Sequence, residues 1–238
     1  MNKIVRISLA LITLFIGLAQ TRATEGHQQK IGKILFLGNS ITRHGPSTKV
    51  DWTGNWGMAA SAEEKDYVHQ VLRAISEATG KQPEAMVVNI AAYEREFATY
   101  EVIEKQKAAF TFKPDVVVLA IGENVPALKT DQAKMELKAS LLKLLRALQR
   151  ENKPAILVRS CFWADPAKDE VLRQACEEAG GIYVDISQLG KDQANYARSE
   201  RTFKNSGVAN HPGDKGMQAI ASALVATMKA SHLLPPAK

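Results

Sequence analysis

The sequence predicts an α/β protein, a three-layer α/β/α sandwich built around a five-stranded parallel sheet. Five short apolar runs alternate with segments in which apolar residues recur at helical spacing. The central runs are apolar throughout, as expected of parallel strands covered on both faces. A chain of 238 residues, 45% of them hydrophobic, is long enough for one sizeable core.

Residues 1–23 have the pattern of a secretory signal peptide. Lys3 and Arg6 precede an apolar run over residues 7–19, and small residues lead up to Ala23. A membrane anchor is the alternative, but the run is shorter than the ~20 residues that span a bilayer. We therefore expect a secreted or periplasmic protein, with one domain over residues 24–238 and no membrane association after cleavage.

The strands and helices are predicted in order along the chain. Expected strands are residues 34–37, 86–90, 115–121, 155–159 and 182–185. Expected helices are residues 62–79, a segment ending near 112, about 130–151, 168–179 and about 214–231. Residues 43–61 form a long connection without periodicity, and Trp52 and Trp56 within it favour an ordered loop.

Composition excludes several classes of function. Removing residues 1–23 lowers the formal net charge from +6 to +3, and no basic run with interleaved aromatic residues suggests nucleic-acid binding. The five histidines are scattered singly, and no cysteine pair has zinc spacing, so we expect no metal. Gly38-Asn39-Ser40 lacks the further glycines of a dinucleotide site, and no cofactor is expected.

The two cysteines, Cys161 and Cys176, are predicted to stay as buried thiols. Cys161 would follow a strand and Cys176 would end the antiparallel helix after it. They would then lie at opposite ends of the sheet, farther apart than the ~7 Å between Cα atoms that a disulfide allows.

Three polar residues follow predicted strands or precede the last helix. Ser40 comes after Gly38, Asn124 after Gly122, and His211 lies in the turn before the last helix. The carboxyl ends of parallel strands share one edge of the sheet, where ligands bind. A serine, a histidine and a hydrogen-bond donor for an oxyanion are what nucleophilic serine chemistry needs. Taken singly, each residue could equally be a helix cap or a turn former.

These segments resemble the conserved blocks of the SGNH, or GDSL-like, hydrolase superfamily. Residues 38–42 are similar to its first block, residues 122–124 to its third and residues 211–216 to its last. The resemblance implies a flavodoxin-like fold, Ser40 as nucleophile and His211 as general base. It also implies that the Ser40 N–H and the Asn124 side chain hold the oxyanion. Members of the family are mostly esterases and lipases, many of them acetylesterases acting on glycans.

The sequence departs from this family pattern at three positions. Asn39 replaces the usual Asp before the serine, and Glu94 occupies the place of a glycine whose N–H normally contacts the oxyanion. The Glu94 N–H could still serve there. Val208 stands three residues before His211, where the family has its catalytic Asp. A backbone carbonyl could orient His211 instead, or Glu94 or Glu123 could substitute; Asp214 is expected to cap the last helix.

The expected substrate is a carbohydrate ester. Trp56 could stack on a sugar ring or pack into the core, and Arg95 and Glu123 could bind hydroxyl or acidic groups. The hypothesis is an exported serine esterase that hydrolyses a small acyl ester, acetyl by resemblance, through an acyl-enzyme. The alternative is a catalytically silent glycan-binding module on the same fold. A lipase or thioesterase finds little support in the polar loop.

Overall fold

A five-stranded parallel sheet forms the centre of the molecule. The structure, a computed structural model, describes residues 31–236, so the predicted signal peptide over residues 1–23 lies outside the described residues. The strands are β1 (Lys33–Gly38), β2 (Glu84–Asn89), β3 (Val116–Ala120), β4 (Ala155–Arg159) and β5 (Ile182–Val184). Their order across the sheet is β2-β1-β3-β4-β5, with every neighbouring pair parallel. The predicted fold class is confirmed.

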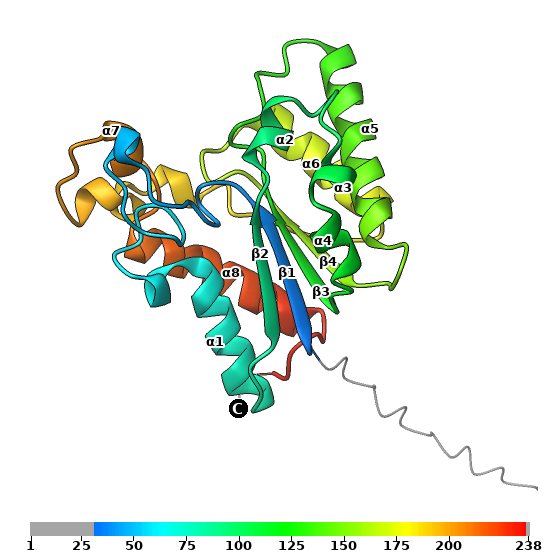
Figure 1. Cartoon of the computed structure of the whole chain (residues 1–238), viewed down its shortest axis with the longest axis horizontal. Coiled ribbons are helices and arrows are strands. Elements are labelled where there is room, and N and C mark those ends of the chain that lie inside the picture. The colour runs from blue at the N-terminus through cyan, green and yellow to red at the C-terminus, as the bar shows by residue number, and fades with distance from the viewer. Residues whose placement is uncertain (1–30, 237–238) are drawn as a thin grey trace, which may run out of the picture.

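Helices cover both faces of the sheet (Figure 1). On one face lie α1 (Tyr67–Thr79) and α8 (Asp214–Ala230), and on the other α5 (Asp131–Leu148) and α6 (Pro166–Glu178). Side chains of a strand alternate between the faces, so Ile34 and Phe36 of β1 pack with α1 and α8 while Leu35 and Leu37 pack with α5. This double burial explains why β1 and β3 are apolar throughout.

The segment after β2 is broken, whereas the sequence predicts a helix ending near residue 112. Three short helices occupy it, α2 (Ala91–Arg95), α3 (Val102–Lys105) and α4 (Lys107–Thr111). The Phe97 carbonyl accepts a hydrogen bond from the Ser140 hydroxyl of α5 at 2.8 Å, and the same hydroxyl lies 3.0 Å from the Tyr93 hydroxyl. A tertiary contact therefore takes the carbonyl that a continuous helix would need.

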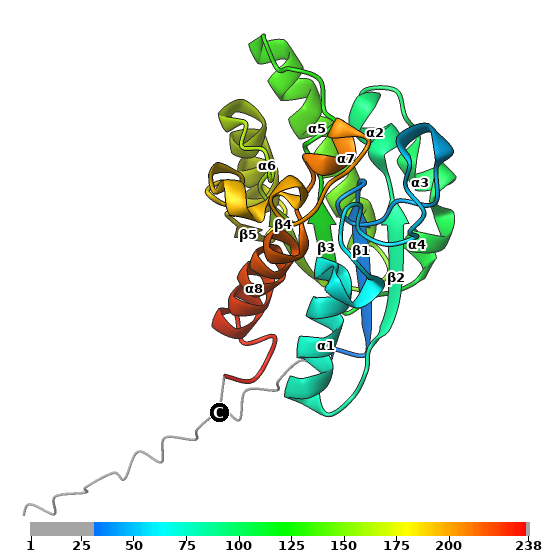
Figure 2. The same cartoon turned by 90° about the vertical axis from the view of Figure 1, so that its left-hand side faces the viewer.

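The long connection after β1 is ordered, as expected. It contains two short 3₁₀ helices (Thr48–Val50 and Glu63–Lys65). Trp52 is buried and packs edge-on against Trp56, with 5.7 Å between ring centroids. A small cluster joins Trp52 to Val208 of α7 (Ser206–Ala209), so this loop and the segment before α8 support one another. Figure 1 and Figure 2 together show α7 beyond the carboxyl ends of the strands and off to the side of the sheet that α1 and α8 cover.

Both cysteines are free and buried, as the sequence predicts. The Cys161 thiol lies close to Gly122, beyond the carboxyl ends of the strands, and the Cys176 thiol lies beside Gly181 before β5 begins. Within residues 31–236, no helix combines the length and apolarity needed to cross a membrane.

Candidate active site

A tight turn after β1 places Ser40 at the carboxyl edge of the sheet. The N–H groups of Thr42 and Arg43 both donate to the Asn39 carbonyl at 3.0 Å, and the turn leads into the long loop without starting a helix at Ser40. Gly38 is required by close approach, since a Cβ there would collide with the Thr42 side chain and lie 2.9 Å from the Ala120 carbonyl. The first block thus needs its glycine for space.

Ser40 and His211 form a hydrogen-bonded pair. Ser40 Oγ lies 2.8 Å from His211 Nε2, and His211 Nδ1 lies 2.8 Å from the Gly207 carbonyl oxygen. A carbonyl only accepts, so Nδ1 carries the proton and the Nε2 lone pair faces the serine hydroxyl. Of the alternatives for orienting His211, the structure contains the backbone carbonyl, and neither Glu94 nor Glu123 takes that place.

The Gly207 carbonyl is available because α7 has only four residues. The last four carbonyls of a helix lack partners within it, and Gly207 belongs to this group. Val208, the residue at the position of the family's Asp, is 2% exposed and packs with Trp52 and Met58. Its side chain therefore belongs to the core and makes no hydrogen bond to His211, whose ring is oriented by the Gly207 carbonyl.

Backbone hydrogen bonds fix the turn that carries His211. The His211 carbonyl accepts from the Ala197 N–H at 2.9 Å, and the Gly213 N–H donates to the Asn195 carbonyl at 2.9 Å. The expectation that Asp214 caps α8 is wrong. Asp214 is the first helical residue and accepts from the Ser61 N–H at 2.7 Å. Glu200 caps the helix instead, its two oxygens each 2.8 Å from the N–H groups of Asp214 and Lys215.

His211 is half-buried and packs against an aromatic ring. The Trp163 ring stands edge-on to the imidazole, with 5.4 Å between ring centroids. Burial lowers the pKa of His211 below its ordinary value; the Gly207 hydrogen bond and the charge of Glu123 oppose this shift, and His44 adds to it. The imidazole is therefore neutral, and able to accept a proton, over a wider range of pH than an exposed histidine.

The structure contradicts one expected oxyanion donor. Among residues 31–236, the Ser40 N–H donates no hydrogen bond and is free. Within the described part of the chain, the Asn124 side chain keeps one free N–H, because its amide nitrogen carries two and only one binds the Glu94 carboxylate, at 2.8 Å. The Glu94 N–H, in contrast, donates to the Ile90 carbonyl within α2 at 3.3 Å. Glu94 therefore does not supply an N–H to the site.

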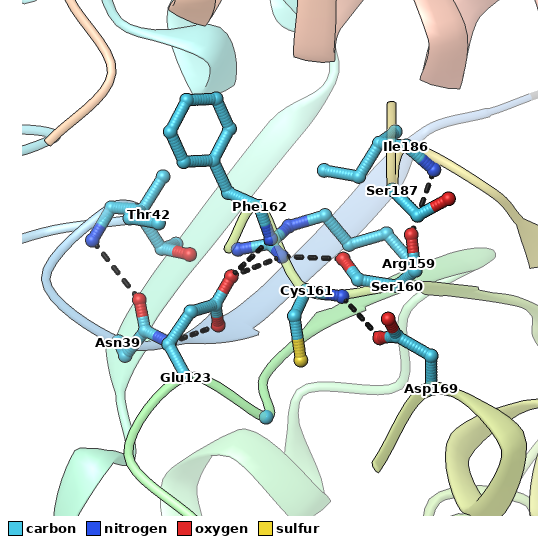
Figure 3. A network of polar contacts seen from close by, with 12 residues as sticks. Asn39, Thr42, Glu123, Arg159, Ser160, Cys161, Phe162, Asp169, Ile186 and Ser187 are labelled. Carbon is cyan, nitrogen blue, oxygen red and sulfur yellow. Dashed lines mark hydrogen bonds and ion pairs between the residues drawn. The ribbon is translucent and has the colours of Figure 1, made fainter. Parts of the chain in front are cut away.

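The prediction that Glu123 binds substrate is also wrong, because its carboxylate is buried. Its side chain is 2% exposed and pairs with the fully buried Arg159, with 2.6 Å between Oε1 and Nη1. Figure 3 shows Asn39 and Arg159 on opposite sides of the Glu123 carboxylate, where Asn39 Nδ2 donates to Oε2 at 2.6 Å. Burial disfavours the charge on Glu123, but Arg159 outweighs it and holds the pKa of Glu123 below its ordinary value.

The other two expected substrate-binding residues are at the surface. Arg95 is exposed, and its Nη2 donates to Asn124 Oδ1 at 3.3 Å. Trp56 is half-buried: its indole N–H donates to the Ala60 carbonyl at 3.1 Å, while its ring lines a polar hollow of about 220 Å³ together with Arg43, Asn55 and His69. Trp56 thus both packs against Trp52 and borders a surface depression.

Sequence reasoning missed three residues of this region. Nothing in the sequence points to Gly207, because its contribution comes from a backbone oxygen. Arg159 had a signal, since a lone cation ending an apolar strand implies a buried partner. Trp163 follows β4 and so lies on this edge of the sheet, but only its packing against His211 distinguishes it from Trp52 and Trp56.

The sandwich fold with a serine-histidine pair at the carboxyl edge of its sheet defines a protein of the SGNH serine hydrolase class. A comparison with protein families matches residues 36–219 to the GDSL-like lipase/acylhydrolase family. The chain belongs to this family, and the resemblance proposed from its three blocks is confirmed. A search of curated proteins finds no significant match.

Solved structures share the fold at low sequence identity. A two-domain esterase active on acetylated mannans is 16% identical, with a TM-score of 0.57 over 87% of this chain and 52% of that one. A Bacteroides uniformis protein described as a GDSL-like lipase is 13% identical, with a TM-score of 0.53 over 84% and 96%. A family two carbohydrate esterase from Clostridium thermocellum is 14% identical, with a TM-score of 0.52 over 83% and 63%. The chain thus spans about half the length of the mannan esterase.

Proposed function

We propose that the protein is an exported serine esterase that hydrolyses a small acyl ester, acetyl in the first instance, on a carbohydrate. The observation that carries this proposal is the 2.8 Å contact between Ser40 Oγ and the unprotonated Nε2 of His211. Two similar folds belong to proteins described as an esterase active on acetylated mannans and as a carbohydrate esterase, which supports a glycan ester as substrate. Export rests on the pattern of residues 1–23.

The chemistry follows from the orientation of the pair. His211 Nε2 accepts the Ser40 hydroxyl proton as Oγ attacks the ester carbonyl carbon. The Ser40 N–H and the free Asn124 N–H donate to the resulting oxyanion. Collapse breaks the bond between the carbonyl carbon and the sugar oxygen, and His211 gives its proton to that oxygen, which leaves as a sugar hydroxyl. Water, deprotonated by the same histidine, then cleaves the acyl-enzyme to a carboxylic acid and restores Ser40.

Replacing the nucleophile tests this proposal directly. Ser40→Ala removes the attacking oxygen and leaves the rest of the site in place, so turnover of p-nitrophenyl acetate should fall by roughly 10³-fold or more. Ser222→Ala, at an exposed serine of α8 without a side-chain hydrogen bond among residues 31–236, is the matched control and should retain turnover and Tm almost unchanged. Unchanged turnover in Ser40→Ala would contradict the proposal. Release of acetate from acetylated mannan and acetylated xylan then compares glycan substrates.

The glycan-binding module remains the competing function, and the observation that favours it is that His211 Nδ1 pairs with the neutral Gly207 carbonyl. A silent module would bind saccharide without turnover. A fluorophosphonate probe distinguishes the two, because it labels only a serine that is activated as a nucleophile. Labelling that disappears in Ser40→Ala supports the esterase, and saccharide binding without labelling supports the module.

A further inference from the structure

The Glu94 carboxylate is buried beneath the candidate oxyanion donor. Glu94 is 0% exposed, and every hydrogen bond to its carboxylate comes from an N–H group. Oε1 accepts from the Gly122 N–H at 2.6 Å, from Asn39 Nδ2 at 3.2 Å and from the Asn124 N–H at 3.3 Å, and Oε2 accepts from Asn124 Nδ2 at 2.8 Å. The side chain thus links the segments that follow β1 and β3.

The side chains of Glu94 and Arg95 hydrogen-bond opposite ends of the Asn124 carboxamide, and we call this arrangement the Asn124 clamp. A carboxylate only accepts hydrogen bonds and a guanidinium only donates them. Glu94 must therefore face Asn124 Nδ2, and Arg95 must face Asn124 Oδ1, as the contacts of 2.8 and 3.3 Å show. Turning the amide by 180° would oppose donor to donor and acceptor to acceptor, so only one orientation satisfies both neighbours.

We infer that Glu94 and Arg95 are positioning residues that hold Asn124 with its second Nδ2 N–H directed at the oxyanion. This inference rests on the proposed esterase function. At the position where related sequences place a glycine N–H, this chain has a residue whose N–H is consumed in α2 and whose carboxylate orients the donor that remains. The site thus lacks the backbone N–H donor at position 94, and the Glu94 side chain instead fixes the orientation of the Asn124 side-chain donor.

Charged groups surround this clamp. Burial and the charge of Glu123 raise the pKa of Glu94, and its hydrogen bonds from the Gly122 N–H, Asn124 and Asn39 oppose this shift. A carboxylate close to a developing oxyanion is unfavourable, because like charges repel strongly where water is excluded. Arg159 neutralises Glu123, Asn39 Nδ2 bridges the two carboxylates, and Arg95 places a cation on the outer side of Asn124. Two guanidinium groups thus accompany two carboxylates, which makes a buried Glu94 compatible with oxyanion chemistry.

The clamp is tested with Glu94→Gln. Gln keeps the shape of Glu but replaces one acceptor oxygen with an NH₂ group, which would then face an N–H donor. The kcat for p-nitrophenyl acetate should fall by roughly 10²-fold with KM within about twofold, because an oxyanion donor acts in the transition state. Glu96→Gln, an exposed neighbour on the same segment, is the matched control and should leave both constants unchanged.

A double-mutant cycle separates positioning from a general structural role. If Glu94 acts through Asn124, Glu94→Gln should add nothing to the loss already caused by Asn124→Ala. Effects that multiply, a rise in KM alone, or an unchanged kcat in Glu94→Gln would overturn the inference. Arg95→Met serves if Glu94→Gln fails to fold: Arg95 is exposed, and its replacement should lower kcat several-fold, again only when Asn124 is present.

A readout independent of turnover keeps this inference apart from the proposed function. The side-chain NH₂ signals of Asn124, identified by their loss in Asn124→Ala, should shift in the NMR spectrum of Glu94→Gln and stay unchanged in Glu96→Gln. If the chemical shifts of the Asn124 NH₂ group are the same in Glu94→Gln as in the unmodified protein, the contact between Glu94 and Asn124 is contradicted. Ser40-independent turnover, or none, would instead contradict the esterase, whatever the Asn124 signals do.

Discussion

A single hydrogen bond decides how His211 behaves. Its Nδ1 donates to a neutral carbonyl, whereas the family pattern has a carboxylate at that position. A neutral partner orients the ring as well as an acid does but stabilises the imidazolium less, since no full opposite charge stands beside it. The carbonyl therefore orients His211 as a base, but it stabilises the imidazolium formed after proton transfer less than a carboxylate would.

This arrangement predicts the pH dependence of activity. His211 must be neutral to accept the Ser40 proton, so kcat/KM should fall as the pH drops through the pKa of His211. Burial places that pKa below its ordinary value of about 6.5, and the acidic limb should lie below that pH. Steady-state kinetics on p-nitrophenyl acetate in buffers of constant ionic strength measures it. A limb above the ordinary histidine value would mean that a carboxylate partner stabilises the imidazolium.

At the scale of the element, the start of α8 determines where His211 sits. Glu200 caps the helix, and Gly216 in its first turn packs against the main chain of Asn195. The Asn195 carbonyl also accepts the Gly213 N–H, two residues after His211. The glycines of the last block therefore allow a helix and a loop to approach closely enough to hold the histidine turn.

Gly216→Ala should reverse the usual effect of this substitution. In an exposed helix, Ala is favoured over Gly by about 1 kcal/mol. Here the added Cβ would meet the Asn195 backbone and lie 2.9 Å from the Pro212 ring. The expected net loss of stability is about 1–3 kcal/mol, with a lower kcat because the His211 turn must shift. Thermal unfolding and p-nitrophenyl acetate kinetics measure both.

The control for this substitution lies on the same helix. Ser222→Ala changes an exposed position of α8, where improved helix propensity is the main effect, and should leave kcat and Tm almost unchanged. If Gly216→Ala is as stable and as active as Ser222→Ala, the prediction is wrong, and the loop at Asn195 moves away from the added Cβ without loss of stability.

For the whole molecule, the sheet separates the two cysteines. Cys161 follows the carboxyl end of β4, and Cys176 lies beside Gly181 at the opposite end of the sheet. Burial also raises the pKa of both thiols, that of Cys176 to about 11, so little reactive thiolate forms at neutral pH. Distance and low reactivity both oppose a disulfide.

Thiol titration checks this prediction without reductant present. The folded protein should react slowly with a thiol reagent, and unfolding in guanidinium chloride should release two thiols per chain. Unfolded protein that contains no reactive thiol would contradict the separation of the two residues. Cys176→Ala should lower the count to one.

Much of the fold is legible in the sequence because the sheet is buried on both faces. Apolar runs such as that of β3 have few alternatives to a central parallel strand. The helix expected to end near residue 112 is broken in the segment where the hydroxyl of Ser140, distant in sequence, donates to the Phe97 carbonyl. Long-range contacts of this kind leave no local pattern.

The site is legible only in part, for a related reason. Ser40, Asn124 and His211 stand out as residue types at strand ends and in a turn. The roles of Glu94 and Glu123 depend on burial, which brings a carboxylate under Asn124 and an arginine against Glu123. The atom that orients His211 belongs to the main chain, and residue identity does not reveal it.

The carbonyl partner of His211 has a consequence for genetics. Every residue type has a main-chain oxygen, so no single codon change removes the acceptor at position 207. A saturation mutagenesis screen for esterase activity should therefore find Ser40 and His211 intolerant of all replacements. At position 207 it should find a graded loss, because a Cβ there would lie 3.0 Å from Asn205 Oδ1, without the all-or-none loss that marks a catalytic acid. The backbone conformation at position 207, and not its side chain, therefore supplies the hydrogen-bond partner of His211.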